Sequence, residues 1–161
     1  MKTNYLSKRD TASLVRKIES AWPPNVVPKT KTIKEYQVDG DESFYKSDEF
    51  TAVQLGKEKY IIPFLGDVSL LTSFPSVTVD MGAVRFICNG AKVTRPGITA
   101  FGNFKKGSIV VIRDEVHNKP LAVGIALIDS DKAADEQRGY VIRTLHYISD
   151  KIWEAHKLLT T

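Results

Sequence analysis

The first hydrophobic pattern along the chain has the period of a helix. Apolar side chains recur one, three and four positions apart, so they lie along one helical stripe: Leu14, Val15, Ile18 and Trp22. Ser7 can cap the first turn, and Asp10 can complete a capping box with it. Pro23 and Pro24 end the pattern. The spacing therefore predicts a helix from Ser7 to about Ala21.

The next part of the chain has the period of strands. Residues 32–38 alternate apolar and polar side chains, which predicts a half-buried strand. Further strand candidates follow, separated by turns at 39–41 and 56–58: residues 44–45, 50–55 and 60–65. With the preceding helix and a short helical turn at 68–71, these strands predict a small N-terminal α+β domain over residues 1–73.

The segment Val79–Ile98, VDMGAVRFICNGAKVTRPGI, combines both kinds of pattern. A strand at 77–79 leads into a short helix over about 82–88, with Asp80 as its cap. Asn89 and Gly90 end that helix, because glycine readily adopts the left-handed conformation that stops one. An extended piece then runs from Ala91 to the turn at Pro96–Gly97.

Short strands dominate the remainder of the chain. Residues 108–112, 121–128 and 140–145 are apolar and rich in β-branched side chains, with turns between them. A short acidic helix over 130–137, capped by Ser130 or Asp131, and a terminal helix capped by Asp150 complete the pattern. Five short strands and little helix predict a compact β-barrel over residues 74–161.

Charge changes the picture most in the central part of the chain. The net charge is +4, and residues 81–113 contain no Asp or Glu. The same stretch holds six cations: Arg85, Lys92, Arg95, Lys105, Lys106 and Arg113. Cations neutralise phosphates, and a turn without a Cβ lets the main chain approach them closely, so this stretch favours a nucleic-acid backbone as ligand.

Several classes of function are disfavoured by composition. The single cysteine, Cys88, excludes an internal disulfide and a cysteine metal cluster, and it is interpreted as a small buried hydrophobe. The three histidines have no ligand-like companions, and residues 1–72 contain no catalytic constellation. No apolar run has the length of a membrane span, and the N-terminus lacks a signal-peptide core. We therefore expect a cytoplasmic protein with no cofactor, no enzymatic activity and no membrane partner.

The motifs of the second half resemble a known family. VDMGAVRFICNGAKVTRPGI, KKGSIVVIRD, KPLAVGIAL and HYISDKIW look like a PUA domain, the small RNA-binding β-barrel named after pseudouridine synthases and archaeosine transglycosylases. The last motif is similar to that of the malignant T-cell-amplified-sequence proteins, which are associated with translation, and their archaeal relatives. The resemblance implies RNA binding without catalysis, with tRNA or rRNA as partner. It also implies that the N-terminal domain docks a ribosomal subunit or a translation factor.

The same resemblance implies the residues of the RNA surface. They come from the first helix of the barrel, the glycine turn, the following strand and the end of the chain: Arg85, Asn89, Gly90, Ala91, Lys92, Arg95, Arg143 and Lys151. Gly90, Lys92 and Arg95 have a structural alternative, since glycines serve turns and cations serve solvated surfaces. His146 and Tyr147 either stack on a base or seal an edge of the core.

Two other functions remain open from the sequence. The chain could be a protein-docking module of the translation apparatus that meets RNA only within an assembled ribosome. It could also be an accessory subunit of an RNA-modification enzyme, because PUA domains are often attached to such enzymes. The short chain argues against an enzyme that acts alone.

Overall fold

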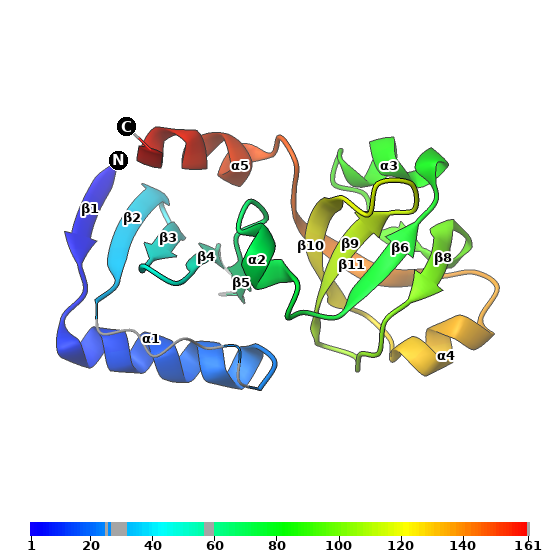
Figure 1. Cartoon of the computed structure of the whole chain (residues 1–161), viewed down its shortest axis with the longest axis horizontal. Helices are drawn as coiled ribbons and strands as arrows, with labels where there is room; N and C mark the ends of the chain where they lie inside the picture. Colours follow the sequence, from blue (N-terminus) through cyan, green and yellow to red (C-terminus); the bar gives the residue numbers. More distant parts are fainter. Residues whose placement is uncertain (25, 27–31, 57–59, 161) are drawn as a thin grey trace. The chain divides into compact units, whose positions relative to one another are not determined.

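The computed structural model describes residues 1–24, 26, 32–56 and 60–160 (Figure 1). Contacts divide the chain into two compact units, Phe74–Lys157 and Met1–Ser73 with Leu158–Thr161. The expected range of the second domain, 74–161, therefore differs from the second unit by the last four residues. Part of the predicted turn at 56–58 lies outside the described residues. No helix among the described residues is long and apolar enough to cross a membrane.

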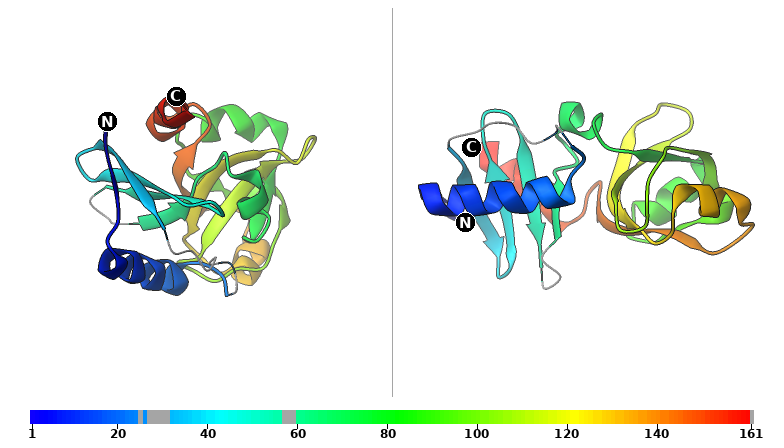
Figure 2. Two further views of the ribbon diagram at one scale, coloured as in Figure 1. Left: turned by 60° about the vertical axis from the view of Figure 1, so that its left-hand side comes forward. Right: turned by 90° about the horizontal axis from the view of Figure 1, so that it is seen from below.

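The first unit is an antiparallel sheet with a helix across one of its faces. Its strands are hydrogen-bonded in the order β1-β2-β3-β4-β5. The elements are β1 (Lys2–Tyr5), α1 (Lys8–Ala21), β2 (Lys34–Asp39), β3 (Glu42–Lys46), β4 (Thr51–Leu55), β5 (Tyr60–Pro63) and α2 (Val68–Leu71). Figures 1 and 2 show α1 lying across the sheet. The predicted helix, strands and helical turn are confirmed, and β1 is an addition that the sequence pattern did not indicate.

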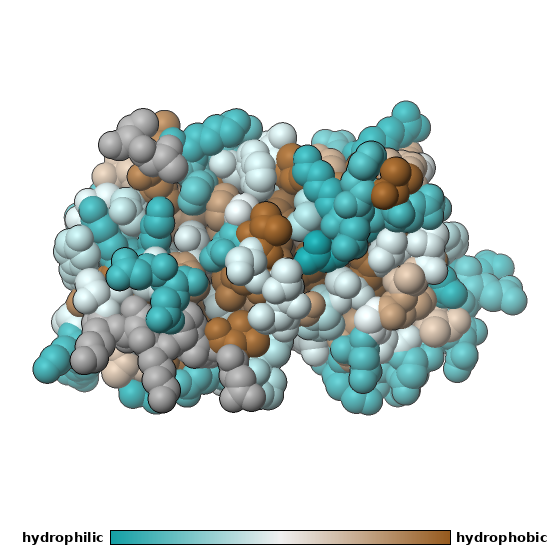
Figure 3. All heavy atoms as spheres, in the orientation of Figure 1, coloured by the Kyte–Doolittle hydropathy of each residue, from teal (hydrophilic) through white to brown (hydrophobic). Residues whose placement is uncertain are grey.

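Helix α1 begins and packs as its sequence predicts. The Ser7 Oγ accepts a hydrogen bond from the main-chain N–H of Asp10 at 3.0 Å, which satisfies one of the free donors of the first turn. Leu14 and Ile18 are buried against the sheet. The Trp22 indole N–H donates to the carbonyl of Ile61 at 3.0 Å, and this bond fastens the end of the helix to β5. Hydrophilic side chains gather along the outer edge of α1 (Figure 3).

The second unit is built on a six-stranded sheet that curls into a barrel. The strand order is β7-β11-β10-β9-β6-β8, in which β6 and β9 are parallel. Its strands are β6 (Ser76–Val79), β7 (Val93–Thr94), β8 (Ile98–Phe101), β9 (Ile109–Asp114), β10 (Pro120–Ala126) and β11 (Tyr140–Tyr147). Its helices are α3 (Met81–Ile87), η1 (Arg95–Gly97), α4 (Ser130–Asp135) and α5 (Lys151–His156), followed by η2 (Lys157–Thr160). The predicted barrel is confirmed, with six strands in place of five.

Gly124 allows two strands of the barrel to approach closely. The register between β10 and β11 shifts between Val123 and Gly124. A Cβ atom at Gly124 would lie 2.4 Å from the carbonyl oxygen of Arg143 and 2.6 Å from the Cγ2 of Ile142. Only glycine fits at this bulge without moving the main chain of β11.

The cap of α4 differs from the prediction. Asp129 occupies the N-cap position, in place of Ser130 or Asp131. The Ser130 hydroxyl is buried, and it accepts from the N–H of Phe104 at 3.0 Å while donating to the carbonyl of Phe104 at 3.1 Å. Ser130 therefore fastens α4 to the segment after β8, and a carboxylate of Asp129 accepts from the N–H of Lys106 at 2.8 Å.

A buried pair joins β11 to α5. His146 is fully buried, and its Nδ1 lies 2.8 Å from Oδ2 of Asp150. Asp150 also accepts from the N–H of Tyr147 at 2.9 Å and from the N–H of Trp153 at 2.7 Å, so the predicted cap of this helix is confirmed. Burial acts to raise the pKa of Asp150, but the hydrogen bond and charge of His146 and the two main-chain donors outweigh burial and lower that pKa. Because His146 is fully buried, it seals an edge of the core, which is one of the two interpretations given by the sequence.

Candidate RNA-binding groove

The candidate site begins at the helix that follows β6. The Asp80 side chain caps α3 by accepting from the N–H of Ala83 at 2.9 Å, as predicted. Gly90 ends the helix with a φ of +91°, and its N–H donates to the carbonyl of Ile87 at 2.9 Å. The next N–H, that of Ala91, donates to the carbonyl of Phe86 at 3.0 Å. These two bonds form the glycine-terminated helix end expected from the sequence, and they reverse the chain so that β7 returns beside α3.

A groove of about 590 Å³ lies between α3, β7, η1 and the start of β11. It is lined by Asp80, Gly82, Ala83, Phe86, Ile87, Ala91, Lys92, Val93, Thr94, Pro96, Gly97 and Tyr140. Lys92 is its one cation and Asp80 its one carboxylate. The remainder of its lining is apolar or uncharged, which suits the faces of planar bases more than it suits a free anion.

Two aromatic rings border this groove, and each carries a cation. Phe86 is 55% exposed and Tyr140 is 61% exposed, which is high for side chains that usually pack inside. The Nζ of Lys92 lies 4.8 Å from the centroid of the Tyr140 ring. The guanidinium carbon of Arg85 lies 4.9 Å from the centroid of the Phe86 ring. Exposed rings beside cations are the combination that stacks bases and neutralises phosphates at single-stranded nucleic-acid sites.

Strand pairing explains why Tyr140 lies beside Lys92. In the pairing of β11 with β7, Tyr140 lies opposite Thr94, and Thr94 follows Lys92 by two residues. The Thr144 hydroxyl donates to the carbonyl of Ala91 at 2.8 Å and fastens the chain just after the glycine turn to β11. These contacts hold the rim of the groove to the barrel.

Most of the predicted site residues lie at or beside the groove. Lys92 and Ala91 line it, and Arg85 lies on α3 against one of its rings. Asn89 and Gly90 form the exposed turn at the end of α3. A Cβ atom at Gly90 would lie 3.2 Å from the Tyr147 ring, so glycine serves both the turn and this packing.

The Arg95 side chain makes its hydrogen bonds outside the groove. Its Nη1 donates to the carbonyl of Ile98 at 3.1 Å, and its Nη2 donates to the carbonyl of Ala134 at 3.4 Å. The guanidinium lies 5.0 Å from the centroid of the Phe101 ring. Arg95 does not line the groove; it links η1 to α4. Its contact with RNA stays a prediction.

Arg143 and Lys151 lie outside the groove lining. Arg143 is on β11, where it is half-buried and pairs with Ile125 of β10. Lys151 is exposed as the first residue of α5. Their contact with RNA stays a prediction.

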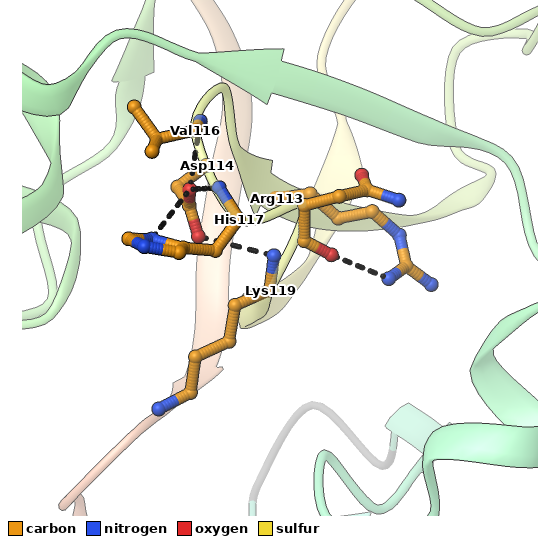
Figure 4. Close-up of polar contacts among 6 residues, drawn as sticks. Arg113, Asp114, Val116, His117 and Lys119 are labelled. Carbon is orange, nitrogen blue, oxygen red and sulfur yellow. Dashed lines mark hydrogen bonds and ion pairs between the residues drawn. The ribbon is translucent and has the colours of Figure 1, made fainter.

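The turn between β9 and β10, whose polar contacts are shown in Figure 4, supports the start of α3. One carboxylate, that of Asp114, accepts from the N–H groups of Val116 at 2.9 Å, His117 at 2.6 Å and Lys119 at 3.0 Å. The bond from His117 is the largest contribution to a pKa of Asp114 below its usual value, and burial opposes it. The N–H of Glu115 donates to the carbonyl of Val79 at 3.0 Å, so this turn holds the residue directly before the α3 cap.

Comparison with known proteins defines the class of the second unit. The family model of the PUA domain matches residues 75–148. A hypothetical protein of Pyrococcus horikoshii OT3 has a similar structure, with a TM-score of 0.78, 27% sequence identity, and coverage of 95% of this chain and 98% of that one.

Sequence relatives cover both units. An uncharacterised protein of Methanocaldococcus jannaschii is 35% identical over 158 residues, which are 94% of this chain and 95% of that protein. Translation machinery-associated protein 20 of Saccharomyces cerevisiae is 32% identical over 75% of this chain and 66% of its own length. The malignant T-cell-amplified sequence 1 homolog of Drosophila melanogaster is 32% identical over 58% of this chain and 56% of its own length. The chain belongs to this PUA-domain family, and its matches span about two thirds of the yeast protein and just over half of the fly protein.

Proposed function

We propose that this chain is a non-catalytic RNA-binding protein of the translation apparatus, and that it holds tRNA or rRNA through the groove of its second unit. The observation that carries the proposal is the pair of exposed rings, Phe86 and Tyr140, each with a cation over its face at the border of the groove. The name of the yeast relative, translation machinery-associated protein 20, supports a role in translation. We extend the proposal to association with ribosomal subunits in the cytoplasm.

In this proposal the groove contacts both the bases and the sugar-phosphate backbone of the RNA. An unpaired base stacks on Tyr140 or Phe86, because every base offers a flat face to an aromatic ring. Lys92 and Arg85 contact the flanking phosphates, and the turn at Asn89–Gly90 approaches the sugar-phosphate backbone through its main chain. Asp80 lies in the lining and repels phosphate, so the backbone runs along the Lys92 side.

The test is a binding titration of labelled tRNA and of an rRNA fragment over a salt series. With about three to five phosphates neutralised, the wild-type log–log slope should be roughly −2 to −4. Lys92→Ala should reduce the magnitude of that slope by about 0.7, the share of one phosphate. Tyr140→Ala should cost about 1–3 kcal/mol at every salt concentration, because stacking is not screened.

A matched control removes one lysine from the same unit outside the groove. Lys132 is exposed on α4 and does not line the groove. Lys132→Ala should leave the slope and the affinity nearly unchanged. Equal effects of Lys92→Ala and Lys132→Ala would refute the groove as the RNA site. Nucleoside analysis of tRNA incubated with the protein tests the non-catalytic part, since any modified nucleoside produced would contradict it.

A further inference from the structure

The first sheet carries two lysines on the face that is turned away from α1. The Lys17 Nζ, on α1, donates to the Gln54 Oε1 at 3.3 Å, so Gln54 and its cross-strand partner Ser43 belong to the face that the helix covers. Lys46 lies three positions after Ser43 on β3. Because successive side chains of a strand alternate between faces, Lys46 belongs to the opposite face.

Strand pairing extends this position into a row across three strands. Lys34 of β2 lies opposite both Tyr5 of β1 and Lys46 of β3. Neighbouring strands are about 4.8 Å apart, so the Tyr5–Lys34–Lys46 row extends over roughly 10 Å. The row therefore presents an aromatic ring and two cations side by side near the end of the sheet.

The two lysines of the row repel each other. Like charges directly opposite on neighbouring strands destabilise a sheet. Neither lysine makes an ion pair with a described residue. Asp48 and Glu49 are the carboxylates that follow Lys46 in the exposed turn, and they too make no ion pair within the described part of the chain. One anionic group that contacts both lysines would turn this repulsion into attraction.

Two tyrosine rings hold the first lysine of the row in place. The Lys34 Nζ lies 5.1 Å from the centroid of the Tyr36 ring and 5.5 Å from the centroid of the Tyr5 ring. Tyr5 is 65% exposed, so much of its ring is open to a further planar group. An exposed ring beside cations is the combination that binds the bases and phosphates of single-stranded nucleic acids.

We propose that the Tyr5–Lys34–Lys46 row is a second RNA contact of the chain, separate from the groove of the second unit. Lys34 and Lys46 bind one phosphate of a single-stranded segment, and the adjacent base stacks on Tyr5. The proposal rests on the proposed function only for the kind of nucleic acid. The carboxylates of Asp48 and Glu49 repel phosphate, so the RNA strand continues on the Tyr5 side of the row. An acidic peptide fits less well, because its carboxylates offer no flat face to this ring.

The experiment is a titration of the ¹⁵N-labelled full chain followed by amide chemical shifts. The probe is a uridine hexanucleotide, and a hexaglutamate peptide is its acidic counterpart without bases. The titration is repeated on a chain that carries Lys92→Ala and Tyr140→Ala in the groove. We expect saturable shifts at β1, β2 and β3 from the hexanucleotide in both chains, with hexaglutamate at least about fivefold weaker.

Variants test the two parts of the row separately. Lys34→Gln with Lys46→Gln keeps the length of both side chains and should reduce the magnitude of the log–log salt slope at these amides by about 0.7, the share of one phosphate. Tyr5→Ala should weaken binding at least about fivefold and leave that slope unchanged, because stacking is not screened. Arg16→Gln is the matched control, since it removes an exposed cation from α1, and it should change neither quantity.

The outcomes separate this row from the groove. Absence of saturable shifts at β1 to β3 up to about 5 mM hexanucleotide would overturn the proposal, as would an unchanged salt slope in the double lysine variant. Equal or tighter binding of hexaglutamate would replace RNA with an acidic peptide as the partner. Shifts at α3 and β7 report the groove in the same wild-type spectrum, so either site can fail without the other. The amide spectrum also reports whether each variant is folded.

Discussion

Replacing Asp150 with alanine should lower the free energy of unfolding of the second unit by about 3 kcal/mol. The carboxylate does three things: it caps α5 through the N–H of Trp153 at 2.7 Å, it accepts from the N–H of Tyr147 at 2.9 Å, and it is 2.8 Å from Nδ1 of the fully buried His146. Loss of the cap costs about 1 kcal/mol. Loss of a partner for a buried polar group costs about 1–3 kcal/mol more.

A second capping aspartate separates these two costs. Asp80 caps α3 in the same manner, through the N–H of Ala83 at 2.9 Å, but no buried histidine depends on it among the described residues. Asp80→Ala should therefore cost only about 1 kcal/mol. Asp150→Asn keeps an oxygen for the cap and should fall between the two alanine variants.

Urea denaturation followed at the amide resonances of β11 measures the second unit by itself. The difference between Asp150→Ala and Asp80→Ala is the joint contribution of the contacts with His146 and with the N–H of Tyr147, about 2 kcal/mol. Equal midpoints for the two variants, within about 0.5 kcal/mol, would refute the view that His146 depends on Asp150.

Three further predictions follow from contacts in the second unit. Gly124→Ala should destabilise the unit by about 3 kcal/mol in urea, because its Cβ would lie 2.4 Å from the main-chain oxygen of Arg143; a loss under about 1 kcal/mol would show that the bulge can relax. The pKa of Asp114 is lowered in the folded state, so its stabilisation is present above the ordinary carboxyl pKa of about 3.9 and is lost as pH falls through the lower folded value. Asp114→Asn should accordingly lose less stability than wild type between pH 5 and pH 2.5, as read from urea midpoints, whereas parallel losses would contradict this assignment. Arg95→Met should lower the thermal midpoint, since it removes the donors to the carbonyls of Ile98 and Ala134, while leaving the salt slope of RNA binding unchanged; a slope reduced in magnitude would show that Arg95 contacts phosphate.

Local signals were enough to predict much of this fold. The stripe of α1 and the caps at Ser7, Asp80 and Asp150 depend on residues a few positions apart, and so does the glycine that ends α3. Each of these predictions is confirmed. Most strands of the two sheets were also predicted, because one or both faces of those strands are buried.

Contacts distant in sequence account for what was missed. Strand β1 is exposed along its whole length, so it has no apolar pattern, and only its pairing with β2 defines it. Arg95 was selected from local charge, and its hydrogen bond to the carbonyl of Ala134, 39 positions away, could not be predicted from the sequence. Ser130 has the composition of a cap, but the distant main chain of Phe104 takes up its hydroxyl.

The residues of the candidate groove were predicted only in part, again because some of them meet through contacts that are distant in sequence. Lys92 and Arg85 were identified from charge in a stretch without acids. The two rings were missed, because an aromatic side chain in a short amphipathic segment usually packs inside. For Phe86, the signal was available in the helical period, since Ala83 and Ile87 already supply the inward face of α3. For Tyr140, only the pairing of β11 with β7 brings it to Lys92.

The wall of the groove is almost entirely one uninterrupted piece of chain. Apart from Tyr140, every lining residue falls between Asp80 and Gly97, and both ends of that piece are attached to barrel strands. The segment from Asp80 to Gly97 can therefore be replaced as one piece by the corresponding segment of another family member, with strands β9 to β11 left unchanged. Ligand preference can thereby change through replacements within one short stretch, provided that Ile87 and Val93, which belong to the barrel core, are kept.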